Sequence, residues 1–247
     1  SVRHAITKLS HLHFPSTKKS KENIIKMGEN KKYVWNTGCP SLDLIKDDLK
    51  IQKNFWKTHG GTGFEVDLYD KYIVVLQHPV TTEYDQAYNQ MSISLKAIKS
   101  LNIPVILLWP NSDAGSDQVS KSIREFKENN RDFPLRLVRH LPTEEYIKLI
   151  YNSVCLVGNS SSAIREGAYL GVPAVNIGTR QINRESCQNI IHTDHSEVKI
   201  KQAILKQIKH GRYKTSKLYG DGKAARRIMK ILSTVDLNIN KSLSYVK

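Results

Sequence analysis

The sequence predicts an α/β fold in which helices cover a Rossmann-like, doubly wound parallel sheet. Short apolar runs alternate along the chain with segments of helical spacing, which is the pattern of strands joined by crossover helices. The runs are nearly continuous in apolar residues, as expected for strands that are buried on both faces. Five such strands in about 160 residues suit an open sheet better than an eight-stranded barrel.

The predicted strands are apolar runs of four or five residues. They cover residues 72–76, 105–109, 135–138, 154–157 and 173–177. The spacing between them predicts helices over residues 86–101, 119–127, 143–151 and 161–170. Thr143 stands directly after Pro142 and is expected to cap the third helix.

The first part of the chain has too few elements to close a core of its own. Its pattern predicts a strand over residues 9–14, a helix over 18–27 and a short strand over 33–36. We therefore expect residues 1–45 to be the end of an N-terminal Rossmann-like domain whose main body is absent.

The remainder is expected to form a C-terminal Rossmann-like domain over residues 46–235. Residues 46–70 are polar and are predicted to be a helix plus a linker. Residues 223–235 have the spacing of a closing amphipathic helix, and residues 236–247 are expected to be a tail.

The composition narrows the class of protein. Lysine plus arginine number 38 against 23 acidic residues, a net charge of +15, which raises the possibility of nucleic-acid binding. The lysines are spread along the chain without interleaved aromatic residues, so a solvated lysine-rich surface is the better interpretation and no nucleic-acid partner is expected.

Neither a membrane partner nor a metal is expected. No apolar run approaches the roughly 20 residues needed to span a bilayer, and the first residues have no signal-peptide core. The three cysteines, Cys39, Cys155 and Cys187, are far apart and form no metal-ligand pattern. This cysteine usage is typical of a reducing compartment, so we expect a cytoplasmic protein. No cofactor is expected.

The most informative stretch is the turn that follows the fourth predicted strand. Residues 158–167 read Gly-Asn-Ser-Ser-Ser-Ala-Ile-Arg-Glu-Gly. A helix that begins at such a turn offers backbone N–H groups and the positive end of its dipole to an anion, typically a phosphate. The expected ligand is therefore a nucleotide or another phosphorylated molecule, and Glu166 lies where its carboxylate can accept hydrogen bonds from ribose hydroxyls.

Other strand ends carry polar residues too. His78, Asn111 and Arg180 follow the first, second and fifth predicted strands, and the carboxyl ends of parallel strands meet at one rim. Each has a plain structural explanation, such as a turn cap for Asn111 or a surface pair for Arg165 and Glu166. Together they predict a polar ligand pocket.

Several segments in this order carry a resemblance to a known family. They are Arg3-His4-Ala5-Ile6-Thr7-Lys8, Gly38-Cys39-Pro40-Ser41, His78-Pro79-Val80-Thr81-Thr82, Pro110-Asn111-Ser112-Asp113-Ala114-Gly115-Ser116, Gly158-Asn159-Ser160-Ser161, Gly178-Thr179-Arg180-Gln181 and Tyr219-Gly220-Asp221-Gly222. The chain resembles the second half of a hydrolysing UDP-N-acetylglucosamine 2-epimerase, the enzyme that opens sialic acid biosynthesis. The resemblance runs from residue 3 to about residue 236, nearly the whole chain.

The resemblance implies the C-terminal half of a GT-B-like two-domain fold and a homo-oligomeric full-length enzyme, a dimer or tetramer. It implies that UDP-GlcNAc and water become ManNAc and UDP, by elimination of UDP and hydration of a glycal-like intermediate. The implied UDP contacts are His78, Asn111, the backbone near Leu141, Ser160, Ser161, Glu166 and Arg180. His78 is also the implied catalytic proton donor to the leaving group, because imidazole ordinarily titrates near neutral pH.

The chain departs from the family pattern in two ways. The N-terminal half, with most of the acidic acid/base residues, is missing, so we expect the chain alone to bind UDP weakly and to turn over poorly or not at all. Animal members place a basic residue for CMP-sialic acid feedback just after the Asp-Ala-Gly-Ser run, where this chain has Asp117. Feedback of that kind is not expected here.

Three alternatives compete with this interpretation. A non-hydrolysing epimerase yields UDP-ManNAc, and its histidine segment typically runs His-Arg-Arg-Glu-Asn, unlike His78-Pro79-Val80-Thr81-Thr82. A GT-B glycosyltransferase would need an acceptor. A basic nucleic-acid-binding module would lose affinity steeply as salt increases.

Overall fold

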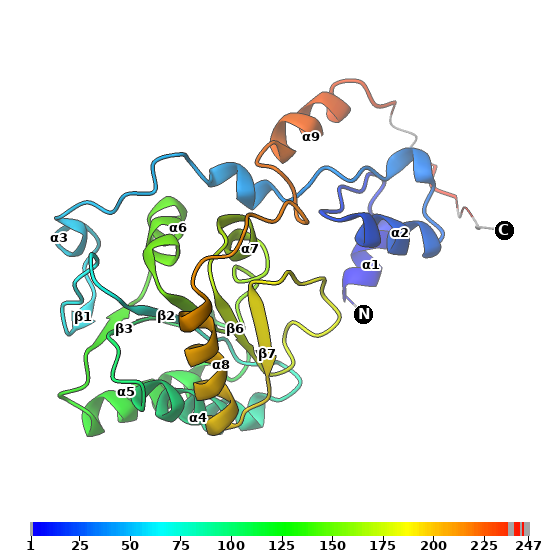
Figure 1. Ribbon diagram of the computed structural model, residues 1–247. Coiled ribbons are helices and arrows are strands. Elements are labelled where there is room, and N and C mark those ends of the chain that lie inside the picture. The colour runs from blue at the N-terminus through cyan, green and yellow to red at the C-terminus, as the bar shows by residue number, and fades with distance from the viewer. Residues whose placement is uncertain (1, 237–239, 243, 245–247) are drawn as a thin grey trace. The chain divides into compact units, whose positions relative to one another are not determined.

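The computed structural model describes residues 2–236, 240–242 and 244. These residues divide into two compact units (Figure 1). The larger unit covers residues 47–216, and the smaller one combines residues 2–46 with those described from 217 onwards.

The larger unit is built on a seven-stranded sheet with the strand order β1-β4-β3-β2-β5-β6-β7. Every neighbouring pair is parallel except β1 with β4. This confirms the predicted fold class. The strands are β1 (Thr62–Gly63), β2 (Ile73–Leu76), β3 (Val105–Leu108), β4 (Leu135–Val138), β5 (Cys155–Gly158), β6 (Ala174–Ile177) and β7 (Ile190–Thr193).

All five predicted strands are present, each within one residue of its expected ends. The sequence prediction missed β7, whose residues are only partly buried and include two polar side chains, and the two-residue β1. Both lie at sheet edges, where a strand is covered less and the apolar signal is weaker.

Six helices belong to this unit. They are α3 (Phe55–His59), α4 (Ala87–Lys99), α5 (Ser116–Asn129), α6 (Thr143–Asn152), α7 (Glu166–Leu170) and α8 (Glu197–His210), with a 3₁₀ turn η3 at Tyr84–Gln86. Thr143 was wrongly expected to cap α6: the cap position is Pro142, without a side-chain bond. The sequence prediction also missed α8, which buries the helically spaced Ile200, Ala203, Ile204 and Gln207.

Helices cover both faces of the sheet (Figure 1). Ile73 and Val75 of β2 pack with α4, α5 and α8 in one core cluster. Tyr72 and Val74 point the other way and pack with Phe55 and apolar residues of α6 in a second cluster. This period-two alternation on a strand buried on both sides explains the continuous apolar run in the sequence.

The segment 46–70 does more than the predicted helix plus linker. Phe55 and Trp56 of α3 are buried against the sheet, and Trp56 Nε1 donates to Val66 O at 2.7 Å. The polar composition concealed this because two large aromatic side chains suffice to anchor an otherwise exposed stretch.

The strand order reverses direction at β2. From β2 the chain moves outwards through β3 and β4, then returns to pair β5 with the other side of β2 and continues through β6 to β7. In doubly wound sheets a crevice opens beyond the carboxyl ends of the strands at such a switch point, and ligands bind there.

The smaller unit contains α1 (Val2–Leu9), α2 (Lys18–Lys26), α9 (Ala224–Leu232) and two 3₁₀ turns, η1 (Lys31–Tyr33) and η2 (Pro40–Leu44). The helices predicted over 18–27 and 223–235 are confirmed. The strands predicted over 9–14 and 33–36 are wrong, since only a single parallel bridge joins His13 to Val34. The sequence prediction also missed α1, which ends at Leu9 before these alternating residues and whose apolar residues Val2, Ile6 and Leu9 are exposed.

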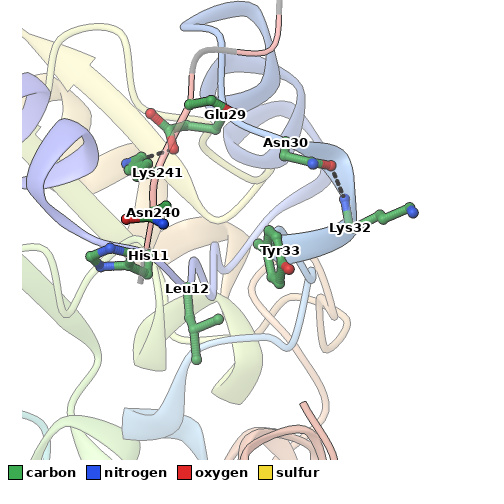
Figure 2. A pocket seen from close by; sticks show the side chains of 9 residues that line it. His11, Leu12, Glu29, Asn30, Lys32, Tyr33, Asn240 and Lys241 are labelled. Carbon is green, nitrogen blue, oxygen red and sulfur yellow. Dashed lines mark hydrogen bonds and ion pairs between the residues drawn. The ribbon is translucent and has the colours of Figure 1, made fainter. Parts of the chain in front are cut away.

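A buried carboxylate joins the two ends of the chain within this unit. Glu29 is only 3% exposed and pairs with Lys8 at 3.0 Å, His13 at 3.0 Å and Lys241 at 2.7 Å. Figure 2 shows Glu29 and Lys241 among the residues that line a pocket. The volume of this pocket is about 160 Å³. Lys8 and Lys241 compensate the charge of this buried acid and the His13 ring bonds it, so Glu29 serves as the attachment point for Lys241. Residues 237–239, 243 and 245–247 of the predicted tail lie outside the described residues.

Gly158 provides a test of the packing at the switch point. Its φ is +134°, and a Cβ on it would lie 2.2 Å from Leu76 O on the neighbouring strand. We expect Gly158→Ala to lower the free energy of unfolding by about 2–4 kcal/mol through backbone strain plus overlap. The matched control is Gly60→Ala, which has φ +71° but open space around it and should cost only the strain, about 1–2 kcal/mol. Urea titration measures both, and equal losses would contradict the proposed overlap.

Candidate functional site

The side chain of Asn159 joins two turns at the switch point. Asn159 follows β5 and is 1% exposed. The His78 backbone N–H donates to Asn159 Oδ1 at 2.7 Å, and Asn159 Nδ2 donates to the His78 carbonyl at 2.8 Å. This pair of bonds fixes the turn after β2 against the turn after β5.

The backbone carbonyl of Asn159 holds a third turn, which follows β6. It accepts from Gln181 Nε2 at 2.7 Å and from Arg180 Nη1 at 3.4 Å. Gln181 is 2% exposed, so this contact is a buried anchor. The guanidinium of Arg180 is thereby held beside His78, as the sequence predicted for residues at neighbouring strand ends.

A fourth turn, after β3, reaches the same place. The Asn111 backbone N–H donates to His78 Nδ1 at 3.2 Å. Asn111 Nδ2 donates to Asp113 Oδ2 at 2.8 Å, and this oxygen also lies 3.5 Å from Arg180 Nη2. The structure therefore brings His78, Asn111 and Arg180 together and adds Asp113, which links two of them.

The expected neutral-range titration of His78 is corrected by its surroundings. Burial, followed by the positive charge of Arg180, lowers the pKa of His78 to about 4, and Asp113 and the bond from Asn111 only partly oppose the shift. The ring is thus neutral at pH 7 in the unliganded protein. Since Nδ1 accepts from Asn111, the proton is assigned to Nε2, which makes Nε2–H a donor for a ligand.

The serine turn differs from the predicted helix start. Residues 161–165 form turns, and the helix α7 begins only at Glu166. The Ser162 backbone N–H donates to Ser160 Oγ at 3.3 Å, and the Ser162 hydroxyl bonds Ser160 Oγ at 2.9 Å and Tyr146 OH at 2.6 Å. These local side-chain bonds compete with the helix. An anion at this turn would therefore meet hydroxyl and turn groups more than a helix dipole.

Of the three serines, two remain available at the rim. Ser162 is 6% exposed and is committed to Tyr146, whereas Ser160 and Ser161 are half-buried. Ser160 and Ser161 therefore stay candidate ligand contacts.

Glu166 and Leu141, the two remaining candidate residues, are both buried. Glu166 is 5% exposed, and its Oε2 has no hydrogen-bond partner, with Arg165 Nε at 3.7 Å. A surface pair is therefore the wrong description of Arg165 and Glu166, because the carboxylate is buried. Leu141 is 6% exposed and its side chain belongs to the second core cluster, so only its backbone is free to contact a ligand.

Sequence reasoning did not select Asn159, Asp113 or Gln181 as site residues, although all three stand inside the quoted motifs. The signal was present in their positions within the turns that follow β5, β3 and β6. Their role is to bond other protein groups, and a residue type does not reveal which neighbour its amide or carboxylate will meet.

The described residues, 2–236 with 240–242 and 244, contain no group of three or more His, Cys, Asp or Glu that could hold a metal ion. Within the same part of the chain, no helix has the length and apolar character needed to cross a membrane.

The fold is that of a Rossmann-like α/β protein, and the polar residues of the candidate site gather at its switch point. Residues 1–233 match the family described as UDP-N-acetylglucosamine 2-epimerase. The chain belongs to this family.

Two curated relatives illustrate the match. The chain is 34% identical over 247 residues to the UDP-N,N'-diacetylbacillosamine 2-epimerase (hydrolyzing) of Legionella pneumophila, covering 99% of this chain and 64% of that protein. It is 29% identical over 222 residues to a UDP-N-acetylglucosamine 2-epimerase of Neisseria meningitidis, covering 90% of this chain and 56% of the relative. The chain therefore spans less than two thirds of the length of either protein.

Solved structures of the family share the fold. The UDP-GlcNAc 2-epimerase of Neisseria meningitidis, solved bound to UDP-GlcNAc, matches 93% of this chain and 63% of its own with a TM-score of 0.72 at 16% identity. The enzyme of Methanocaldococcus jannaschii, solved with UDP-GlcNAc and UDP, matches 91% of this chain and 61% of its own with a TM-score of 0.69 at 15% identity. The likeness confirms the GT-B-like, Rossmann-type fold predicted from the sequence.

The lowered pKa of His78 gives a pH prediction. Its pKa is about 4 in the folded chain against an ordinary 6.5, so between these values the unfolded chain binds the extra proton. The contribution is fully present above pH 6.5 and is lost as the pH falls to 4. We expect the wild type to lose about 2 kcal/mol more of its unfolding free energy than His78→Gln between pH 7 and pH 4.5. Denaturant titrations at both pH values check this, and parallel losses would contradict it.

Proposed function

We propose that this chain is the UDP-binding half of a hydrolysing UDP-GlcNAc 2-epimerase that serves sialic acid or capsule sugar synthesis. The observation that carries the proposal is the Asn159-centred network, which holds His78, Asn111 and Arg180 together at the switch point. Membership of the family and the hydrolysing relative in Legionella pneumophila support it. The reaction would convert UDP-GlcNAc and water into ManNAc and UDP.

The site residues have complementary roles in this proposal. Ser160, Ser161 and Arg180 hold the pyrophosphate, since hydroxyl donors and a guanidinium suit phosphate oxygens. Glu166 accepts from the ribose hydroxyls through its buried carboxylate. Asn111 and the backbone at Leu141 complete the contacts to UDP.

The proposed reaction breaks two bonds of the sugar in its first stage. A base removes the C2 proton, the C1–C2 double bond forms, and the electrons of the C1–O bond leave with UDP. Water then adds its hydroxyl to C1 and a proton returns to C2 from the opposite face. The growing negative charge on UDP is stabilised by Arg180 and by the His78 Nε2–H donor.

His78 is suited to its role because the ligand changes its environment. The pyrophosphate is anionic, and a nearby negative charge raises the pKa of a histidine. Binding of UDP-GlcNAc would thus bring the imidazole towards the neutral range in which it can transfer a proton to the leaving group. The groups that act on the sugar at C2 would belong to the part of the full-length family members that this chain does not cover.

The hydrolysing outcome is favoured by His78-Pro79-Val80-Thr81-Thr82, which differs from the basic segment expected of the non-hydrolysing type. The Legionella pneumophila relative acts by name on UDP-N,N'-diacetylbacillosamine, so this substrate is the second candidate. Proton NMR of the products of the full-length enzyme separates a free 2-acetamido sugar from UDP-ManNAc, and parallel assays with both nucleotide sugars identify the substrate.

Several features of the whole protein belong to the same proposal. Residues 1–45 would complete an N-terminal Rossmann-like domain, and residues 46–235 would form the UDP-binding domain. The full-length enzyme would be a homo-oligomer, a dimer or tetramer. It would be cytoplasmic, in keeping with the buried thiol of Cys155, which forms no disulfide.

UDP binding tests the site directly. We expect UDP to raise the melting temperature of the 247-residue chain, and Arg180→Ala to weaken UDP by about 10- to 100-fold through loss of a charge-assisted contact. The control is Arg131→Ala, an exposed arginine that precedes β4 at the opposite end of the strands. Isothermal titration calorimetry measures the affinities. A nucleotide-independent shift, or equal affinities for both variants, would count against the proposal.

Turnover separates the two halves. The base that removes the C2 proton is proposed to lie outside the 247 residues of this chain. The purified chain should therefore bind UDP but release no measurable ManNAc from UDP-GlcNAc. A coupled assay for free ManNAc checks this. Sustained release by the chain alone would place the missing acid/base chemistry within these residues.

A further inference from the structure

The turn that carries Arg180 is anchored on both sides of that residue. On the C-terminal side Gln181 Nε2 donates to the Asn159 carbonyl at 2.7 Å. On the N-terminal side the Thr179 hydroxyl donates to Glu83 Oε1. Arg180 therefore stands between two fixed neighbours.

Glu83 is itself held by a second bond from a helix. Its other oxygen, Oε2, accepts from Gln90 Nε2 at 2.7 Å, and Gln90 is a buried residue of α4. Glu83 belongs to the segment that begins at His78. Within this segment the Glu83 backbone N–H donates to Val80 O at 2.8 Å. The carboxylate thus connects the His78 segment and α4 to the Arg180 turn.

The Arg180 turn is also packed against His195 at Gly178. Gly178 has φ +75°, and a Cβ on it would lie 2.4 Å from His195 Nε2. His195 follows β7, and both of its ring nitrogens are buried without a hydrogen-bond partner. The ring fills space against Gly178, so the turn has little freedom to move in that direction.

We infer that Glu83 is a positioning residue for UDP, which acts through Thr179 to hold the guanidinium of Arg180 at the pyrophosphate. The inference rests on the proposed function and deepens it. A flexible arginine would lose side-chain and backbone freedom on binding, whereas a turn already fixed at residues 179 and 181 has met most of that cost before the ligand arrives. Glu83 also makes the His78 segment and the Arg180 turn respond as one unit.

The test removes one anchor at a time in the 247-residue chain. Thr179→Val deletes the hydroxyl with little change of shape, and Thr179→Ser restores it. Glu83→Gln replaces the carboxylate by a neutral amide, whose oxygen can accept from Gln90 while its NH₂ donates to the Thr179 hydroxyl, so the charge-assisted bond at Thr179 becomes a weaker neutral one. The matched control is Glu125→Gln, which changes a half-buried glutamate bonded to Tyr88 on α4. UDP affinity is measured by NMR titration, which extends to weak binding.

We expect Thr179→Val to weaken UDP binding by about three- to tenfold, which is the loss of one positioning hydrogen bond, and Glu83→Gln to weaken it by about threefold, because a charge-assisted bond becomes a neutral one. Thr179→Ser and Glu125→Gln should stay close to the wild type. In an Arg180→Ala background Glu83→Gln should cause no further loss, because residues that act through one another are not additive.

Unchanged affinity in Thr179→Val and Glu83→Gln, while Arg180→Ala still weakens UDP, would overturn the positioning role and leave the proposed function intact. A further loss in the Arg180→Ala background would also overturn it, because Glu83 would then act without Arg180. Absence of UDP binding by the wild type would overturn both the proposed function and this inference.

Discussion

The buried amide of Asn159 is the interaction on which the candidate site depends. Its side chain forms hydrogen bonds with both the N–H and the carbonyl of His78, and its backbone carbonyl accepts hydrogen bonds from Gln181 and Arg180. Burying an amide costs free energy unless its donors and acceptors form hydrogen bonds. When they do, the hydrogen bonds of the network strengthen one another. One residue at the switch point therefore sets the relative positions of three turns that are far apart in the sequence.

This arrangement is possible because the sheet beneath it is rigid and closely packed. The central strand β2 is buried on both faces, and Gly158 allows β5 to approach Leu76 where a side chain would collide. The candidate site then combines three kinds of polar group: the neutral ring of His78, the Arg180 guanidinium, and the buried Glu166 carboxylate. A cationic arginine beside neutral and anionic hydrogen-bonding groups suits an anionic nucleotide with ribose hydroxyls.

The sequence was informative where one property decided the structure. The strands β2 to β6 were predicted well because a continuous apolar run on a parallel strand has few alternatives. His78, Asn111 and Arg180 could be grouped in advance because the topology of a parallel sheet collects strand ends. The charge of His78 could not be read in the same way, since its pKa depends on burial and on Arg180, which is distant in the sequence. Helix α7 begins later than predicted because Ser160, Ser162 and Tyr146 form hydrogen bonds with one another. Tyr146 lies on α6, so the helix propensity of the serine turn could not reveal this contact.

The central claim concerns where the pyrophosphate lies. The most direct measurement is a crystal structure of the chain grown with UDP. The account predicts pyrophosphate density between the Ser160–Ser161 turn and the Arg180 guanidinium, with His78 Nε2 within hydrogen-bond distance of a phosphate oxygen. UDP bound away from the carboxyl ends of β2, β5 and β6, or with Arg180 still paired to Asp113 and out of contact, would contradict it.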